Sequence, residues 1–433
     1  MGFSADQDPD IFLAAALASR ATAGGDICLD LDSMSATVLL EQAANHDPVF
    51  CPAVPEWRQK LIAHAAVGTP GDRCPLILDD RNRLYLYRYW NYENQLSSAI
   101  RSRAAGELAD FNPRKIKAGL ERLFPATDKG VDRQKVAALI ALLKPFCVIT
   151  GGPGSGKTFT IAGILAFILE STGRSNLNIC LAAPTGKAAA RLGQSILQAK
   201  EHLNCSRSVK DSIPDEVFTI HRLLQPISGT PYFRYDSHNL LAADIVVVDE
   251  ASMVDLALMS KLLQAIEPDT RLLIVGDKDQ LASVEAGSVL GDICNRQVIH
   301  GFSNGFLKQI EAISGISTEN FTRMPDTDSA LQDCICLLQT NYRFSSHSGI
   351  GGLSRAINHG EIEKCLALLK KPSETAVEWV AINTPNDLNR QLAEVIIAGY
   401  RKYLTIRDPV LAMDAFSGFK ILCALKIGPY GVK

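Results

Sequence analysis

The stretch that decides the fold is Phe146–Thr158, which reads FCVITGGPGSGKT. Its first five residues form a short apolar run of the kind that makes a buried strand, and the glycines after them interrupt it. Gly151–Thr158 then fits the spacing G-x₄-G-K-[ST], and a helix-forming segment follows. A strand, a glycine-rich turn and a helix N-terminus in this order predict a phosphate-binding loop in an α/β domain.

Each residue type in this loop has a chemical role. The glycines allow backbone N–H groups to converge on phosphate oxygens, and the helix N-terminus adds a partial positive charge. Lys157 is expected to reach the β- and γ-phosphates, and Thr158 is expected to ligate Mg²⁺. We therefore predict a site for ATP and Mg²⁺ that is formed by Gly151, Gly152, Pro153, Gly154, Ser155, Gly156, Lys157 and Thr158.

Two further apolar segments end in polar residues, Ile245–Glu250 (IVVVDE) and Leu272–Gln280 (LLIVGDKDQ). The carboxyl ends of parallel strands meet at one edge of a sheet, where ligands bind, so both are expected beside the phosphate loop. Asp249 suits the Mg²⁺ shell, Glu250 suits general-base activation of the attacking water, and Gln280 is placed to touch the γ-phosphate. The alternatives are solvation of a strand end for the carboxylates and a turn without a catalytic role for Gln280.

Candidate nucleic-acid contacts lie on another strand, turn and helix N-terminus, Ala183–Leu192 (APTGKAAARL). Small residues and exposed N–H groups there suit the phosphates of a nucleic acid, and Thr219–Leu224 (TIHRLL) can add to the same surface. Helix capping and packing are the alternative. The candidate DNA contacts are Pro184, Thr185, Lys187, Thr219 and His221.

Two more side chains are candidates because of their positions. Arg343, in the NYRF stretch Asn341–Phe344, can act as an arginine finger on a γ-phosphate, whereas an isolated arginine usually forms a surface ion pair. Gln134 precedes the phosphate loop by one helix and one strand, and its amide can read an adenine edge. Chemistry alone does not separate that role from a structural one.

Residues 1–110 form an N-terminal unit by their pattern. Helices are expected near Ile11–Ser19 and Ser35–Asn45, and a β-hairpin is expected from Leu76–Leu78 and Leu84–Trp90. Aromatic residues alternate along the second strand of this hairpin, which favours packing against a core or a partner subunit. Stacking on bases is the alternative.

From residue 131 onwards, apolar strands alternate with helices, which predicts a parallel sheet covered on both faces. Residues 300–333 are rich in Ser, Asn, Thr and Asp, and we expect an inserted loop or a small exposed helix there. A second α/β pattern is expected further on, with strands Val377–Ala381 and Lys420–Leu425.

The composition places broad limits on the protein. A length of 433 residues predicts two to three domains. The net charge of −3 does not indicate a polyanionic partner, so a nucleic-acid site requires a local basic groove. No pair among the eleven cysteines has the C-x₂-C spacing of a zinc site, which favours free thiols in a reducing compartment. We expect a cytoplasmic protein without a signal peptide or a membrane segment.

Taken together and in this order, the motifs GGPGSGKT, APTGKAAARL, VVVDEASMVD, VGDKDQLASVEAG and NYRF resemble those of superfamily 1 DNA helicases. LYLYRYWNYE in the N-terminal unit and LLQTNYRFSSHSGIGGLSRAIN at residues 337–358 are similar to the RecD family within that superfamily. The resemblance covers nearly the whole chain from about residue 11.

The resemblance implies an α/β architecture in three parts. These are a mainly helical N-terminal partner-docking domain with a β-hairpin (1–110), a RecA-like P-loop motor domain (111–335) and an incomplete second RecA-like domain (336–433). It also implies ATP-driven movement 5′ to 3′ along single-stranded DNA, in a heterotrimer with RecB-like and RecC-like subunits that acts in double-strand break repair and recombination. DNA cutting would belong to the partner. By the same resemblance, Gln134 becomes an adenine contact and Arg343 a finger on the γ-phosphate.

The sequence departs from the family pattern near its C-terminus. It contains no TVHKSQG-like segment and no late V-A-x-T-R-like motif with a second arginine for the γ-phosphate. About half of a second motor domain is therefore expected to be missing, with the break near Gly418–Val432. Two alternatives to an active helicase subunit follow: a catalytically impaired, ATP-binding assembly module, and a stand-alone superfamily 1 helicase.

Overall fold

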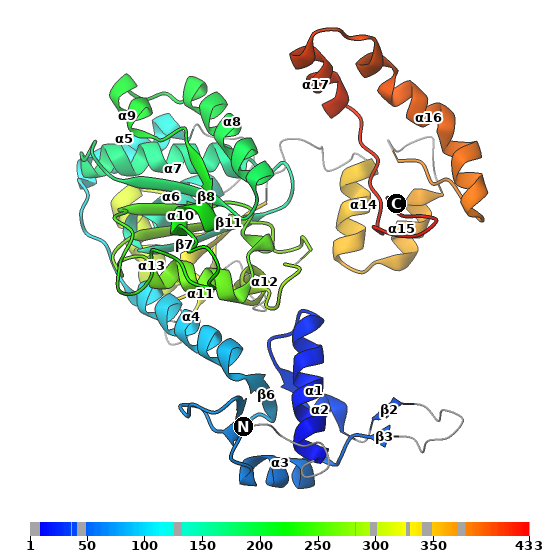
Figure 1. Cartoon of the computed structure of the whole chain (residues 1–433). Helices are drawn as coiled ribbons and strands as arrows, with labels where there is room; N and C mark the ends of the chain where they lie inside the picture. Colours follow the sequence, from blue (N-terminus) through cyan, green and yellow to red (C-terminus); the bar gives the residue numbers. More distant parts are fainter. Residues whose placement is uncertain are drawn as a thin grey trace. The chain divides into compact units, whose positions relative to one another are not determined.

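The computed structural model describes residues 9–35, 37–40, 49–124, 132–281, 283–294, 301–325, 330–339, 349–370 and 377–432. The chain divides into two compact units, Met1–Arg343 and Phe344–Lys433. The first unit contains a sheet with helices packed on both of its faces (Figure 1).

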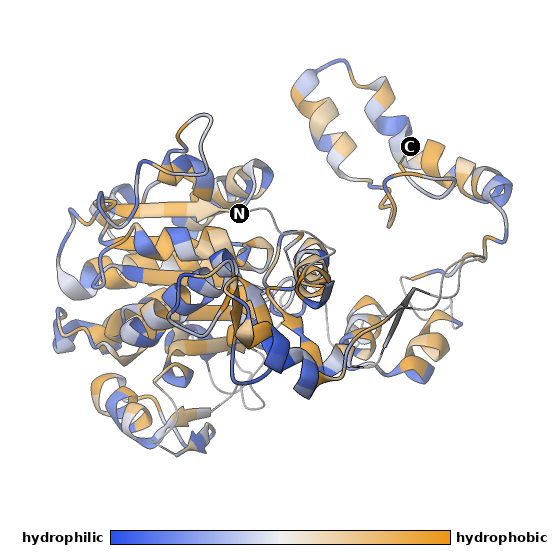
Figure 2. Cartoon of the chain, turned by 60° about the horizontal axis from the view of Figure 1, so that its bottom comes forward, coloured by the Kyte–Doolittle hydropathy of each residue, from blue (hydrophilic) through white to orange (hydrophobic). Residues whose placement is uncertain are grey.

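A six-stranded sheet forms the centre of the first unit. Its strands follow the order β14-β7-β11-β10-β8-β9, and each neighbouring pair is parallel. All residues of the three middle strands β7, β11 and β10 are buried, as in a sheet covered on both faces, and Figure 2 shows the strands as hydrophobic. The predicted P-loop fold is thereby confirmed. The strands are β7 (Phe146–Gly151), β8 (Ile179–Ala183), β9 (Val217–Thr219), β10 (Ile245–Val248), β11 (Arg271–Gly276) and β14 (Ile335–Leu338).

Successive residues of each strand face opposite sides of the sheet and enter two separate cores. Cys147 and Ile149 belong to one core, whereas Phe146 and Val148 belong to the other. The first core is covered by α5 (Pro113–Leu123), α6 (Arg133–Leu143), α7 (Lys157–Thr172), α8 (Gly186–His202) and α13 (Asn304–Ser314). The second is covered by α4 (Tyr87–Ala105), α10 (Ile220–Leu224), α11 (Leu256–Gln264) and α12 (Val289–Cys294).

The polar stretch at residues 300–333 is part of the fold and not an exposed insertion. It contains β12 (Gly301–Ser303), α13 and β13 (Thr322–Met324), and Phe302 is buried in the first core. Its polar residues have structural roles: the Ser303 hydroxyl caps α13, and the Asp333 carboxylate accepts hydrogen bonds from the backbone and hydroxyl of Ser303. The predicted exposure is therefore wrong.

The N-terminal region has its own small core around Trp57, between two helices and a sheet of order β1-β6-β5-β4. The predicted hairpin is confirmed at its turn, where Leu78 pairs with Leu84 in an antiparallel ladder. The elements are α1 (Pro9–Ala23), β1 (Leu29–Asp30), α2 (Leu31–Met34), α3 (Val54–Ala63), β4 (Val67–Gly68), β5 (Leu76–Leu78) and β6 (Arg83–Leu86).

Two N-terminal predictions are wrong in their boundaries or type. The hairpin strand does not continue to Trp90, because α4 begins at Tyr87, directly after β6. Tyr85 and Tyr89 are buried, which agrees with packing as the role of the aromatic cluster. In place of the helix expected near Ser35–Asn45, Val38–Leu40 forms β2, which pairs with β3 (Val49–Phe50); residues 41–48 lie outside the described ranges.

The second unit is helical in its described parts. It contains α14 (Gly349–Asn358), α15 (Ile362–Leu369), α16 (Pro385–Thr405) and α17 (Pro409–Ser417). The strands expected at Val377–Ala381 and Lys420–Leu425 are absent from its described residues, because these segments do not pair in a ladder. The boundary expected after residue 335 also fails, since it falls inside β14, which pairs with β7. None of the helices in the described ranges is long and apolar enough to span a membrane.

Candidate nucleotide-binding site

The phosphate loop connects β7 to α7, and its backbone requires glycine at residues 151, 154 and 156. A Cβ atom on Gly151 would lie 2.8 Å from the carbonyl oxygen of Leu338 and 2.8 Å from Ser155 Oγ. Gly154 and Gly156 have φ values of 82° and 80°, in the left-handed region that disfavours side chains. A Cβ on Gly152 would meet nothing within 4 Å, so the backbone is open to a ligand there.

Lys157 folds back over this loop. Its Nζ donates to the carbonyl oxygens of Gly151 at 2.7 Å and Gly152 at 3.3 Å. Ser155 Oγ is buried without a hydrogen-bond partner among the described residues. A buried orphan hydroxyl and a half-buried ammonium at the start of α7 fit a phosphate, which accepts hydrogen bonds from both.

The two predicted carboxylates follow β10. Asp249 is 9% exposed, and its backbone N–H donates to the carbonyl of Ala182 at 2.9 Å. Burial raises the pKa of Asp249 to about 6, and the Glu250 charge adds to this, against the opposing effects of a backbone hydrogen bond and of Lys157. The effect of Lys157 on this pKa shows that the Asp249 carboxyl lies near the lysine of the phosphate loop.

Glu250 has an uncommon conformation, with φ of 52° for a residue that carries a side chain. Its Oε2 is buried without a hydrogen-bond partner within the described ranges. An orphan carboxylate oxygen beside a buried aspartate favours a cation, and Mg²⁺ takes such oxygen ligands together with nucleotide phosphates. The residues present therefore fit the predicted Mg²⁺, and Asp249 and Thr158 stay its predicted ligands.

Gln280 lies in the loop that follows β11. A Cβ on Gly276 would lie 3.2 Å from the backbone N of Ala251, so this strand end packs directly on the turn after Glu250. Ser252 Oγ donates to Gln280 Oε1 at 3.4 Å, which brings the glutamine to the same turn. The Lys278 N–H donates to Thr150 Oγ1 at 3.1 Å and ties the loop to the phosphate-loop strand.

Three residues of this network were not predicted from the sequence: Thr150, Ser252 and Asp277. Asp277 is 3% exposed, and burial raises its pKa. Its Oδ1 accepts from the Asp279 N–H at 3.1 Å, so it shapes the turn before Gln280. All three stand directly at strand ends or next to a predicted carboxylate, a position that could have indicated them.

Gln134 lies at the start of α6, where Asp132 caps the helix. Its Nε2 donates to Thr160 Oγ1 at 2.9 Å, and that hydroxyl donates to the carbonyl of Gly156 at 2.9 Å. The side chain thus reaches the helix that follows the phosphate loop. Adenine recognition by Gln134 stays a prediction.

The candidate DNA contacts lie at the ends of two neighbouring parallel strands, since Ala183 of β8 pairs with Thr219 of β9. The Thr185 and Thr219 hydroxyls accept from the N–H groups of Ala188 and Arg222, both at 3.2 Å, as helix caps. Both threonine hydroxyls therefore act as helix caps, which was the alternative to DNA contact at these two positions. Lys187 and His221 are exposed and Pro184 is half-buried.

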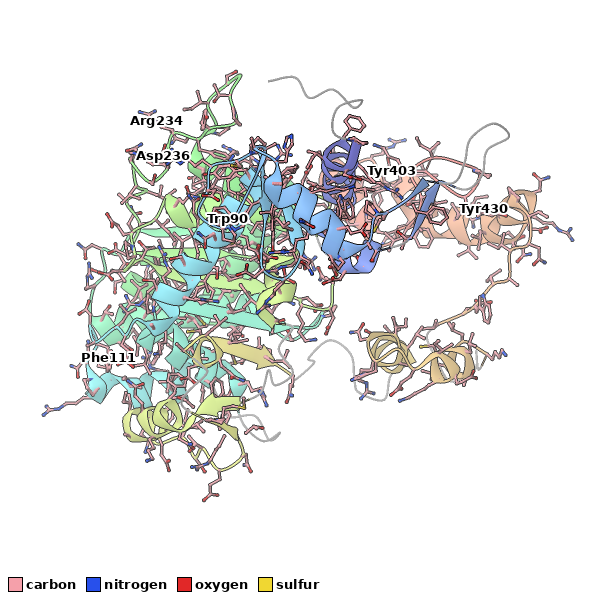
Figure 3. All side chains as sticks on the ribbon, turned by 90° about the horizontal axis from the view of Figure 1, so that it is seen from below. Trp90, Phe111, Arg234, Asp236, Tyr403 and Tyr430 are labelled. Atoms are coloured by element: carbon pink, nitrogen blue, oxygen red, sulfur yellow. The ribbon has the colours of Figure 1, made fainter. Side chains whose placement is uncertain are left out.

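A projecting loop follows α10, and Arg234 and Asp236 lie on it (Figure 3). Phe233 anchors this loop, with its ring centroid 5.7 Å from that of His221. Arg343, the candidate arginine finger, and the NYRF stretch lie outside the described residues.

The fold and the site define a P-loop nucleotide-binding motor domain of the RecA-like type, with the phosphate loop, the carboxylates and Gln280 on adjacent strands. A family model for an AAA domain matches residues 134–286. A model described as "RecBCD enzyme subunit RecD, N-terminal domain" matches residues 2–85.

The chain belongs to the family of the RecBCD enzyme subunit RecD. It is 36% identical over 371 residues to that subunit of Haemophilus influenzae, covering 84% of the chain and 57% of the relative. It is 34% identical over 434 residues to that of Mycolicibacterium smegmatis, covering 99% of the chain and 68% of the relative. The chain thus spans between 57% and 68% of the length of these two relatives.

Two further matches cover smaller parts of the chain. The ATP-dependent RecD2 DNA helicase of Deinococcus radiodurans is 35% identical over 213 residues, covering 47% of the chain and 25% of that helicase. Among solved structures, a Pif1 from Bacteroides sp. in complex with ADP-AlF4 is 17% identical with a TM-score of 0.32, covering 62% of the chain and 57% of that structure.

Proposed function

We propose that this protein is an ATP-dependent 5′–3′ single-stranded DNA translocase and helicase subunit of a RecBCD-type complex. The observation that carries the proposal is the convergence of Lys157, Asp249 and the Gln280 loop at the carboxyl ends of three adjacent parallel strands. Membership of the RecD family supports the assignment of this site to a DNA motor.

The chemistry follows from the side chains. Lys157 exchanges its two carbonyl partners for the β- and γ-phosphates of ATP, and Thr158 and Asp249 hold Mg²⁺, which neutralises phosphate charge when bound. Glu250, with its orphan oxygen, accepts a proton from the attacking water. Gln280 orients that water or the γ-phosphate from the adjacent turn. Arg343 supplies the finger in this proposal.

We place the proposed binding surface for single-stranded DNA at the carboxyl ends of β8 and β9. With both threonine hydroxyls occupied as caps, Lys187 and His221 are the exposed side chains for phosphate contact. The N-terminal region, residues 1–110, is the proposed docking domain for the RecC-like scaffold subunit, in a cytoplasmic heterotrimer that also contains a RecB-like subunit. Double-strand break repair and recombination is the corresponding process.

A second candidate function rests on the unit Phe344–Lys433. In its described ranges only Ala356 is fully buried, and large apolar side chains such as Leu422 (93% exposed) are open. A motor of this type closes two well-packed domains around ATP. The described side chains of this unit are mostly not buried, so they form no comparable core. The second candidate is therefore an ATP-binding assembly module with weak turnover.

Strand displacement tests the first candidate. The chain is mixed with RecB-like and RecC-like subunits and given duplexes with a 5′ or a 3′ tail, with a nuclease-inactive partner. The partner's motor is also disabled, so that the remaining unwinding reports this chain. Preference for the 5′ tail, lost in Lys157→Ala, is expected; preference for the 3′ tail would overturn the proposal.

Two further measurements separate the alternatives. Binding of a fluorescent ATP analogue without DNA-stimulated hydrolysis, with or without partners, would favour the assembly module. Unwinding by the chain alone, with no co-purifying subunits, would favour a stand-alone helicase.

A further inference from the structure

The N-terminal region touches the motor at the loop that carries Gln280. The backbone N–H of Gly287, at the end of that loop, donates to the carbonyl oxygen of Gly25 at 3.1 Å. Gly25 lies in the turn that ends α1, and Figure 1 shows α1 with one end close to α12, which begins two residues after Gly287. The two regions therefore meet within reach of the nucleotide site.

The fit at this contact excludes even a methyl group. Gly287 has φ of +99°, and a Cβ on it would lie 2.7 Å from Cβ of Leu256 and 3.1 Å from Cγ2 of Ile27. Ile27 packs against the second core of the motor, although it belongs to the N-terminal region. The turn containing Gly25 and Ile27 thus forms one side of a cradle around the end of the loop.

The other side of this cradle comes from the motor itself. The Leu256 N–H, at the start of α11, donates to the carbonyl of Ala286 at 3.3 Å. Leu256 lies six residues after Glu250 in the sequence, and Ser252, between the two, donates a hydrogen bond to Gln280. By contrast, the outer part of the loop is open, with Leu281 and Val284 92% and 97% exposed. The loop is held at both ends, by the Lys278–Thr150 bond after β11 and by Gly287 before α12, so its open outer part takes its position from these two anchors.

We infer that the turn at Gly25 and Ile27 positions the Gln280 loop, so that the N-terminal docking region controls how the motor reads the γ-phosphate. Gly287 and Ile27 are positioning residues in this scheme, because they act through Gln280 and do not touch nucleotide. The inference rests on the proposed role of Gln280 and adds a route by which docking of the N-terminal region reaches the ATP site.

The test measures binding of ADP and of a non-hydrolysable ATP analogue, each with Mg²⁺, by displacement of a fluorescent nucleotide from the full chain. The reference variant is Gln280→Ala, which is expected to lose about tenfold in analogue affinity, as for one hydrogen bond to a charged group, with ADP unchanged. Gly287→Ala and Ile27→Ala are expected to reproduce that selective loss, reaching roughly three- to tenfold.

Matched controls separate positioning from general strain. Gly229→Ala introduces a side chain at φ of +75° where nothing lies within 4 Å, and Ile62→Ala truncates an isoleucine that is 48% exposed. Both are expected to bind the two nucleotides like the unmodified chain. Thermal unfolding of every variant identifies a folding defect, and Ile27→Ala keeps the test valid if Gly287→Ala does not fold.

The outcomes are distinct. If Gln280→Ala loses analogue affinity while Ile27→Ala and a folded Gly287→Ala keep it, the positioning role is overturned and the proposed function stands. If Gln280→Ala has no effect, the γ-phosphate role and the positioning role fall together. If Lys157→Ala leaves binding of both nucleotides intact, the nucleotide site itself is wrongly assigned.

Discussion

Gln134 Nε2 lies 2.9 Å from Thr160 Oγ1, and this bond joins the helix before the phosphate-loop strand to the helix after the loop. The amide is thereby held beside the loop. The same hydroxyl donates to the carbonyl of Gly156, so Gln134 influences the left-handed glycine at the end of the loop through one intermediate. In this arrangement Gln134 supports the phosphate loop, and its role as an adenine reader is a prediction.

Gln134→Ala is expected to lower ATP affinity about tenfold and to remove the preference for ATP over GTP, because the amide that reads the base is lost. Thr160→Val removes the hydroxyl that bonds Gln134 and the carbonyl of Gly156, but it keeps a similar volume and leaves the Gln134 amide in place, so it should retain base preference. Competition binding with both nucleotides checks this. Equal base preference in Gln134→Ala and the unmodified chain would contradict adenine recognition.

Glu250→Gln is expected to lower ATP turnover in the assembled complex by roughly 10²–10⁴-fold, since an amide cannot accept the proton of water. Nucleotide affinity should change little, because the side chain keeps its shape. Glu267→Gln, at an exposed glutamate on the surface, is the control and should turn over normally. Comparable turnover in both variants would remove Glu250 from its proposed role.

Lys187→Ala is expected to weaken single-stranded DNA binding and to reduce by about one the slope of log affinity against log salt concentration, because one phosphate contact is lost. The loss should be similar for different DNA sequences. Lys308→Ala removes an exposed lysine of α13, away from the ends of β8 and β9, and should leave the slope unchanged. Fluorescence anisotropy over a salt series measures both, and equal slopes for the two variants would place DNA elsewhere.

The thiol of Cys336, buried in β14, gives a pH-dependent contribution to stability. Burial raises its pKa from 9.0 to about 12. Above pH 9 the unfolded chain releases this proton while the folded chain retains it, so the free energy of unfolding falls as pH rises. Between pH 8 and pH 10 this single thiol accounts for a loss of about 1.4 kcal/mol.

Urea unfolding at the two pH values tests this, with Cys336→Ala as the variant that lacks the buried thiol. The advantage of the unmodified chain over Cys336→Ala should shrink by that amount on going to pH 10. Cys423→Ala, at an exposed cysteine, should follow the unmodified chain. Parallel behaviour of both variants would show that Cys336 ionises normally.

Local signals were sufficient for much of the motor. The strand expected over the first five residues of Phe146–Thr158 matches β7 (Phe146–Gly151) to within one residue, because the apolar run there ends at a glycine-rich turn. The phosphate loop and its carboxylates were identifiable because their chemistry depends on residues close together in sequence. Strand order and the pairing of β14 with β7 depend on long-range packing, which no local pattern encodes.

The failures have physical reasons as well. Aromatic residues favour strands, and for that reason the hairpin strand was extended to Trp90, although Tyr89 is buried in α4 together with Leu96 and Ile100. The polar residues of 300–333 resembled a loop, yet the Ser303 hydroxyl caps α13 over a buried aromatic cluster and the Asp333 carboxylate accepts hydrogen bonds from Ser303. At the nucleotide site, Thr160 was not identifiable as a partner of Gln134, since the two positions are 26 residues apart.

The pairing of β14 with β7 also limits how far the candidate finger can travel. Leu338 lies opposite Gly151 in that ladder, and Arg343 is five residues further along the chain. A chain of five residues spans at most about 18 Å even when fully extended. The backbone of Arg343 is therefore tethered within that radius of the strand end next to the phosphate loop, whatever conformation the intervening residues adopt. This limit is compatible with a role of Arg343 at the nucleotide site of its own chain, and it excludes sites whose distance from the strand end exceeds that radius by more than the length of an arginine side chain.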